Sequence, residues 1–583
     1  MKKKRKNPKQ VTKKTFNFTL LAFLIIAVIS ILIYSNSFDC EFQFDDESNI
    51  SEQAVIKKLS NFTDLSIWKN INFRPLTMFT FAINYHFNKL DVVGYHVGNL
   101  IIHIIMGWFV FLLINLIFSL QSIKSDSFSE DKKYLALFAA LICVAHPIQT
   151  QAVTYIVQRM TSLAAMFYII SIFLYAKGRI IHIKKGLKWD ALILYIGALL
   201  SGVFALLSKQ NAATFPLAML LFELFIIRNK ENKPFKKYLI FSSSVLLLVF
   251  LAIVFSGNLP KETEQISRIN YLITQFRVMI KYIQLLLLPV HQNLDYNFYA
   301  SNTFWNLKEI GSFLIILGLF ISGVLLFRKQ RILSFGIFWF FLTLSVESSI
   351  LPISDIIYEH RLYLPMIGYS LCVISIIWLI FSSKRKSIMF ILLMIIIFSY
   401  GYATFNRNKV WKTRYTLWSD VVKKSPTKLR PWYNLGNIWK DKKEVNKAIQ
   451  CYTKAQRINP NDPMVLSNLG SIFLEKGELD KALEYYGKAL KIDPDHAVAL
   501  NGLGSIWVYK GKLNKAKEYY EKVLEIKPND AEAINNLGIV WARKREFDKA
   551  IECFKKALEI NPDNSNALKN LKIVSKEKSN EKK

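Results

Sequence analysis

The sequence predicts an all-α protein: a polytopic membrane bundle of about eleven helices followed by a C-terminal α-solenoid. Two observations predict it. Hydrophobic residues make up 52% of the 583 residues and gather into apolar runs of roughly 20 residues, the length that crosses a bilayer as a helix. From Leu429 onward these runs stop and a 34-residue period begins, which is typical of stacked helical repeats.

The formal net charge of +33 is compatible at first with nucleic acid or an anionic membrane surface as the partner. The cations of the first two thirds come in short clusters between apolar runs, however, as the positive-inside rule requires. The charge therefore reports membrane topology and argues against nucleic acid. The five cysteines form no CxxC pair and no zinc-ligand spacing, so neither disulfides nor a structural metal is expected.

The chain begins with a basic tail, residues 1–15, ahead of an apolar run from Phe16 to Tyr34. A cleaved signal peptide is the alternative interpretation. The run is nearly 20 residues long and no small-x-small cleavage site follows it, so we expect a retained first span with a cytoplasmic N-terminus.

Further apolar runs extend the predicted transmembrane domain over residues 16–405. These runs are Tyr95–Leu120, Tyr134–His146, Met160–Ala176, Trp189–Leu207, Ala212–Ile227, Tyr238–Phe255, Leu307–Phe327, Leu333–Leu351, Leu362–Phe381 and Ile388–Phe405. A twelfth segment, Leu272–Pro289, is apolar but carries Arg277 and Lys281.

Loop charge decides how to treat that twelfth segment. With eleven spans, the basic loops around Lys184, Lys230, Lys329 and Lys384 all fall on the cytoplasmic side. A twelfth span would move two of them outside. We therefore expect Leu272–Pro289 to be an interfacial or re-entrant helix, and the C-terminal repeats to lie outside the membrane.

The 34-residue period has the tetratricopeptide (TPR) pattern and occurs four times in phase. Its recurring residues are Leu435-Gly436, Leu469-Gly470, Leu503-Gly504 and Leu537-Gly538, then Ala448, Ala482, Ala516 and Ala550, and finally Pro460, Pro494, Pro528 and Pro562. We assign residues 429–564 to four repeats. Residues 406–428 form a linker that includes a half repeat, and residues 565–583 form a cap and a polar tail.

TPR stacks present a concave groove to protein partners. Asn434, Asn468 and Asn536 share one repeat position, with Gly502 in the remaining repeat. Amides spaced in this way could hydrogen-bond the backbone of an extended peptide. The alternative is that asparagine is simply common at this position of the repeat.

Two neighbouring acids, Asp45 and Asp46, lie in the predicted first outer loop. A carboxylate here can accept the proton of an attacking hydroxyl while a neighbouring charge tunes its pKa. The alternative is a solvated acidic turn. A divalent cation beside them is compatible with the residue types, but no spacing requires one.

Cations also gather at the predicted outer boundary, where the positive-inside rule would not place them. They are Arg74, Arg159, Lys209, Arg277 and Arg361. A bound anion would explain them, and a lipid phosphate is the natural candidate. The alternative for each residue is snorkelling to headgroups. Four auxiliary candidates lie nearby in sequence: His146, Glu359, His360 and Tyr363.

The motifs FDDE, FRPLT, GYHVGNLIIH, HPIQTQAV, LSKQNAATFP and EHRLYLP resemble those of the transmembrane-and-TPR O-mannosyltransferase-like proteins and their bacterial relatives. The resemblance covers about Asp45 to Pro365, together with the repeats. It implies a GT-C glycosyltransferase fold with an outer-face site, a polyprenyl-phosphate sugar donor and a protein hydroxyl acceptor. The family's acidic first-loop motif falls on Asp45 and Asp46. Gln151 and Gln210 stand where relatives often have acids, so the sugar and the role of a second acid stay open.

The predicted function is therefore transfer of a hexose, mannose or similar, to Ser or Thr of exported proteins, with the repeats capturing the acceptor at a bacterial cytoplasmic (inner) membrane. Asp45 or Asp46 is the expected base, and Arg361, Arg159 and Lys209 are expected to hold the leaving phosphate. No nucleotide-binding motif is present, as expected for a lipid-carried donor. The alternatives are a surface-polysaccharide polymerase or ligase that uses lipid-linked sugars, and a non-catalytic membrane-anchored TPR scaffold.

Overall fold

The computed structural model describes residues 18–70, 73–120, 131–227, 266–349, 351–353, 355–381 and 385–581. Within them the chain is helical and forms two compact units, Met1–Asp420 and Val421–Lys583. The all-α prediction with a C-terminal repeat solenoid is confirmed. The unit boundary falls inside the segment that the sequence predicts to be a linker with a half repeat.

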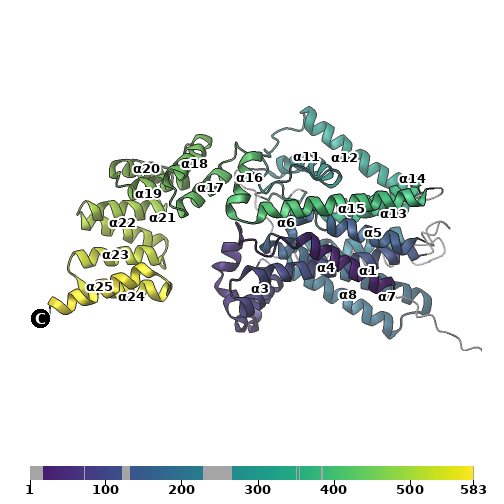
Figure 1. The fold of residues 1–583 in the computed structure, drawn as a ribbon, viewed down its shortest axis with the longest axis horizontal. Coiled ribbons are helices and arrows are strands. Elements are labelled where there is room, and N and C mark those ends of the chain that lie inside the picture. Colours follow the sequence, from purple (N-terminus) through teal and green to yellow (C-terminus); the bar gives the residue numbers. More distant parts are fainter. Residues whose placement is uncertain are drawn as a thin grey trace, which may run out of the picture. The chain divides into compact units, whose positions relative to one another are not determined.

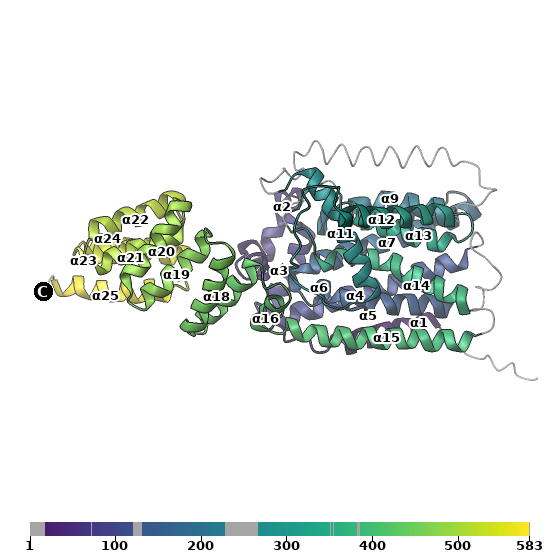
Figure 2. The ribbon, with the colours of Figure 1, turned by 90° about the horizontal axis from the view of Figure 1, so that it is seen from above.

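Long helices of the first unit, among them α4 (Val92–Ser119), α7 (Arg159–Lys185) and α15 (Lys386–Asn408), run along a common direction (Figures 1 and 2). Further described helices of this unit are α1 (Phe18–Tyr34), α3 (Pro75–Asn88), α5 (Lys132–Ala145), α6 (Thr150–Val153), α8 (Trp189–Ser208), α9 (Phe215–Phe222), α11 (Arg268–Leu287), α12 (Leu307–Leu326), α13 (Arg331–Leu344) and α14 (Pro365–Phe381). The short helices α2 (Leu65–Lys69) and α16 (Arg414–Lys424) complete this set.

Six described helical segments are long and apolar enough to cross a membrane, or seven if the bent pair Lys132–Ala145 and Pro147–Val153 counts as one span. The bend of 48° occurs at Pro147, which lacks the N–H needed to continue the helix. The apolar helices α1, α13 and α14 are shorter. The predicted span Tyr238–Phe255, with the basic loop around Lys230, lies outside the described residues, as does Lys384. The count of eleven stays a prediction.

Two predicted segments have informative bounds in the structure. The expected span Leu333–Leu351 is too long, because α13 ends at Leu344 and a turn over Ser345–Ser349 follows it. The segment Leu272–Pro289 forms one 20-residue helix, α11, which buries an apolar face and is not among the long apolar helices. That amphipathic character agrees with the predicted interfacial or re-entrant helix, whose position at a membrane stays a prediction.

Helices α13 and α14 meet through a pair of glycines. A Cβ on Gly336 would lie 2.7 Å from the Gly368 carbonyl oxygen, and one on Gly368 would lie 2.5 Å from the Gly336 oxygen. No other residue fits at either position, so the two backbones are in direct contact. Beside them the buried Trp339 donates its indole N–H to the Leu364 carbonyl at 3.0 Å. This contact fixes the turn after α13 and the segment before α14.

A buried polar network ties the ends of three segments together. The Asn408 side chain at the end of α15 donates to the Ile33 carbonyl at 3.1 Å and to Asn36 at 3.0 Å, and it accepts from Thr154 at 3.0 Å. Asn36 in turn donates to the Phe405 carbonyl at 2.7 Å. Because buried polar groups need partners, this network holds the end of α1 and the segment before α7 beside the end of α15.

The second unit stacks paired helices, as Figure 1 shows in green to yellow. The pairs are α17 (Leu429–Asp441) with α18 (Val445–Ile458), α19 (Pro463–Glu475) with α20 (Leu479–Ile492), α21 (Ala497–Tyr509) with α22 (Leu513–Ile526), and α23 (Ala531–Arg543) with α24 (Phe547–Ile560). The predicted cap and tail form a longer helix, α25 (Ser565–Glu581), in which Ala567 and Val574 are buried. The repeat phase predicted from the sequence is confirmed.

The repeat glycines are required by an aromatic ring in the partner helix. A Cβ on Gly470 would lie 2.8 Å from the Tyr486 ring, and Gly436, Gly504 and Gly538 face Tyr452, Tyr520 and Phe554 at 2.6–2.7 Å. The glycine thus lets the ring lie against the helix backbone. By contrast, a Cβ on Gly487 would meet no atom within 4 Å.

We therefore expect Gly470→Ala to destabilise the repeat unit by about 1–3 kcal/mol, because the ring must shift in a packed core. Gly487→Ala, the matched control, should stabilise it by about 0.5–1 kcal/mol through helix propensity alone. Urea unfolding of the segment Val421–Lys583 measures both changes. Equal effects of the two substitutions would contradict the packing argument.

Candidate active site

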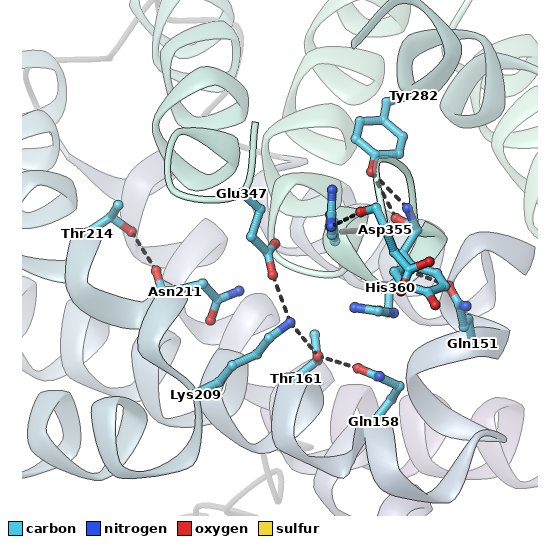
Figure 3. Close-up of polar contacts among 12 residues, drawn as sticks. Gln151, Gln158, Thr161, Lys209, Asn211, Thr214, Tyr282, Glu347, Asp355 and His360 are labelled. Carbon is cyan, nitrogen blue, oxygen red and sulfur yellow. Dashed lines mark hydrogen bonds and ion pairs between the residues drawn. The ribbon is translucent and has the colours of Figure 1, made fainter. Parts of the chain in front are cut away.

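A buried ion pair lies where α8 ends. Lys209 directly follows α8, and its Nζ lies 2.8 Å from Oε1 of Glu347, in the turn after α13 (Figure 3). Nζ also donates to Thr161 Oγ1 at 3.1 Å, and that hydroxyl donates to Gln158 Oε1 at 2.8 Å. Only 8% of Lys209 and 6% of Glu347 are exposed. Burial lowers the pKa of Lys209, and the Glu347 carboxylate opposes that shift.

Arg361 adds a second cation to this group. It lies in the short helix Glu359–Leu362, just before α14, and is 4% exposed. Its guanidinium donates to the carbonyls of Ile356 at 2.9 Å and Asp355 at 2.6 Å, which fix its orientation. Its charge interacts directly with that of Glu347. The charges of Arg361 and Lys209 therefore both act on Glu347.

Arg74 is the third cation. It precedes α3 with a left-handed φ of 54°, and Pro75 begins the helix. This backbone conformation is strained for a residue with a Cβ. Burial lowers the pKa of Arg74, while the carboxylates of Glu347 and Asp45 raise it. Arg74 thus links the acidic first loop to the Lys209–Glu347 pair.

His360 and a small cavity complete the site. The cavity is lined by Thr161, Tyr168, Asn211, His360 and Arg361, among others. The His360 backbone N–H donates to Gln151 Oε1 at 2.8 Å, and the ring stacks on Tyr358 with centroids 5.1 Å apart. Burial and the neighbouring cations lower the pKa of His360 well below its usual value, so the ring is neutral.

Asp45 and Asp46 have different environments. Asp46 is fully buried, and its carboxylate accepts the backbone N–H of Gln43 at 2.8 Å and of Val157 at 2.6 Å. Burial raises the pKa of Asp46 to about 8, against the effect of the two N–H donors. Asp45 is half-buried, and its backbone N–H donates to the Tyr155 hydroxyl at 2.9 Å. Asp46 therefore anchors the loop, and Asp45 is the acid beside the cation cluster.

The structure does not bring Arg159 to the cluster. Its guanidinium is buried and donates to Asn99 at 2.6 Å, Asn84 at 2.6 Å and the Tyr95 carbonyl at 2.8 Å. Its Cζ also lies 4.6 Å from the centre of the Phe81 ring. With its donors directed at protein acceptors, Arg159 joins α3 and α4 to α7.

Arg277 also lies in a separate cluster. It pairs with Glu309 at 3.2 Å, donates to Ser301 Oγ at 3.0 Å and packs on the Phe298 ring. This pair joins α11 to α12. Of the five predicted phosphate-binding cations, Arg74, Lys209 and Arg361 are therefore brought together.

The remaining auxiliary candidates are engaged in hydrogen bonds that hold elements of the fold. His146 contacts Ile148 and Leu286, Glu359 contacts Gln292, Asn293 and Tyr296, and Tyr363 contacts His103. Among the described residues, no three His, Cys, Asp or Glu side chains are grouped as metal ligands. The Glu47 carboxylate, next to the two aspartates, pairs with Arg414.

The sequence did not predict Glu347 as a site residue, because Glu347 lies within the predicted membrane span Leu333–Leu351. The signal was present: a carboxylate within an apolar run is costly and usually has a partner or a function. Thr161 and Asn211 were also missed, because single hydroxyl and amide groups give no pattern in a sequence.

In the repeat unit the three asparagines lie half-buried on α17, α19 and α23. Asn434 donates to the Arg430 carbonyl at 3.0 Å, and Asn468 contacts the Asn437 side chain at 3.5 Å. Asn536 accepts from Asn535 at 3.3 Å. They recur at one position of the first helix of each pair, as the sequence predicts.

Comparisons with known proteins confirm the resemblance seen in the motifs. Tetratricopeptide-repeat families match residues 430–462, 461–529 and 531–564. The chain is 27% identical over 471 residues to the protein O-mannosyl-transferase F38B6.6 of Caenorhabditis elegans, covering 75% of this chain and 63% of that protein. It is 23% identical over 496 residues to the human protein O-mannosyl-transferase TMTC3, covering 76% of this chain and 52% of the relative.

The chain thus spans between half and two thirds of the length of these two relatives. Among solved structures, the crystal structure of MamA is similar at 28% identity, covering 26% of this chain and 87% of that one, with a TM-score of 0.23.

Proposed function

We propose that this protein is a membrane glycosyltransferase that moves a hexose, mannose or similar, from a polyprenyl phosphate to Ser or Thr hydroxyls of exported proteins. The proposal draws on its similarity to proteins named protein O-mannosyl-transferases. The observation that carries it is the cluster of Arg74, Lys209 and Arg361, with Asp45 beside Arg74. An anchor for a scaffold needs neither these buried cations nor the acid.

In the proposed reaction, Asp45 accepts the proton of the acceptor hydroxyl as its oxygen attacks the anomeric carbon. The bond from that carbon to the phosphate oxygen breaks in the same displacement, and the phosphate leaves with the bonding electrons. Arg74, Lys209 and Arg361 stabilise the negative charge that grows on the leaving phosphate. Such a single displacement inverts the anomeric configuration.

The position of the cluster supports a site on the outer face. Thr161 lies in the first turn of α7, and the predicted cytoplasmic loop around Lys184 lies at its other end. The two ends are roughly 35 Å apart at 1.5 Å per residue, enough to cross the hydrocarbon core. A transferase on that face has no access to cytoplasmic nucleotide sugars, so a lipid-carried donor fits.

The repeats are proposed to capture the acceptor through the asparagine positions. We expect Asn434→Ala, Asn468→Ala and Asn536→Ala together to raise KM for an acceptor polypeptide about tenfold, the loss of roughly 1.4 kcal/mol of binding. kcat should stay within about twofold, because these residues do not touch the reacting atoms. Steady-state kinetics over a range of acceptor concentrations measure both constants. An unchanged KM would assign the asparagines to repeat packing alone.

The function is tested by deleting the gene in its host and analysing exported proteins by mass spectrometry. We expect Ser and Thr peptides to lose a hexose, and the wild-type gene to restore it. Loss of a surface polysaccharide with intact peptide modification would favour a polymerase or ligase. No change in either would favour the scaffold.

A further inference from the structure

We infer that Glu347 is a competing counter-ion: it pairs with Lys209, releases Lys209 when a phosphate binds, and so limits how tightly the site retains the polyprenyl phosphate product. This inference rests on the proposed function and deepens it. Glu347 is a positioning residue in this scheme, because it acts through Lys209 and not on the reacting atoms. We refer to this as the counter-ion role of Glu347.

The backbone of Glu347 is fixed on both sides. Its N–H donates to the Leu344 carbonyl at 3.1 Å, and its carbonyl accepts the Tyr271 hydroxyl at 2.8 Å. The turn is thus held to α13 and α11. A change of partner by Glu347 would therefore involve rotation of its side chain only. This geometry suits a group that exchanges partners without moving the backbone.

The carboxylate is only partly satisfied. Oε1 pairs with Lys209, the Asn211 side chain also interacts with the carboxylate, and Oε2 is buried with no hydrogen bond of its own within the described part of the chain. Lys209 Nζ has three donors, of which one reaches Glu347 and another Thr161. A phosphate oxygen that takes the place of Oε1 would meet Lys209 at a point where the charges of Arg74 and Arg361 also act.

The net charge of this group is neutralised by the charge of the donor but not by that of the product. Arg74, Lys209 and Arg361 carry three positive charges, and Glu347 and Asp45 carry two negative ones, which leaves a net charge of +1. A sugar–phosphate–lipid diester has one negative charge, whereas the released phosphate monoester has up to two. Binding either ligand also takes Lys209 away from the buried Glu347 carboxylate, which is unfavourable. That cost opposes binding of the donor and of the product alike, and after transfer it weakens retention of the product.

The test measures binding of a short-chain polyprenyl phosphate to the purified full-length protein in detergent, so no transfer is needed. We expect Glu347→Gln to bind it about tenfold more tightly than wild type, because the amide keeps the shape but no longer competes for the cation. The matched control is Glu309→Gln, which neutralises a buried acid paired with Arg277 outside the cluster and should leave the affinity unchanged. A merely structural role for Glu347 would weaken binding instead.

The outcomes separate the two levels of the proposal. If wild type binds the lipid phosphate and Glu347→Gln binds it equally or more weakly, the counter-ion role of Glu347 is wrong and the proposed function stands. If wild type does not bind the lipid phosphate at any concentration, both the proposed donor and the counter-ion role of Glu347 are wrong. Should Glu347→Gln fail to fold, Glu347→Met, a neutral side chain of similar size, carries the same expectation.

Discussion

Asp45→Asn is expected to lower the rate of sugar transfer by a factor of about 10²–10⁴, the usual contribution of a general base. The amide has nearly the shape of the carboxylate but cannot accept the acceptor's proton. Asp45 is half-buried, so folding should be unaffected. The measurements are kcat with a purified lipid-linked hexose donor and the thermal unfolding temperature of the same preparation.

Asp46→Asn, by contrast with Asp45→Asn, is expected to lower stability. Its two carboxylate oxygens accept backbone N–H groups of Gln43 and Val157, and the amide NH2 would face one of these donors. We expect a loss of about 1–3 kcal/mol in unfolding free energy, the cost of a buried unsatisfied donor. If Asp46→Asn abolished transfer in a fully stable protein while Asp45→Asn did not, the roles of the two acids would be reversed.

Lys209→Met should have the second large effect. We expect transfer to fall at least about 100-fold, because the leaving phosphate loses a buried cation. The substitution also removes from the buried Glu347 its ion-pair partner and leaves it only the charge of Arg361, which should destabilise the first unit by about 3–5 kcal/mol.

The double variant Lys209→Met with Glu347→Gln separates stability from chemistry. Neutralising both partners removes the buried unpaired charge, so the unfolding temperature should return towards wild type while transfer stays low. Recovery of transfer in the double variant would show that Lys209 acts only through folding.

The repeats were the most predictable part of the fold. Glycine, alanine and proline recur at fixed spacing, and each has one local role, so the phase could be read directly. The apolar runs located helices nearly as well, with the exception of Leu333–Leu351. Hydropathy averages over a window and does not register that the helix ends at Leu344, before Glu347.

The site was predictable only in part. Residue type and loop position identified Arg74, Lys209 and Arg361, but they also selected Arg159. Arg159 and Thr161 are two residues apart on α7, and such residues point to different sides of a helix. Thr161 contacts Lys209, and Arg159 therefore faces the opposite packing layer. Charge alone carries no information on that direction.

The glycine contact between α13 and α14 has a consequence for altering donor choice. Backbone meets backbone at Gly336 and Gly368, so any side chain added at either position would push the two helices apart. The turn with Glu347 follows α13 and the segment with Arg361 precedes α14, so their spacing depends on this contact. A bulkier headgroup would therefore have to be accommodated by changes at residues around Lys209 and Arg74, with the two cations themselves retained.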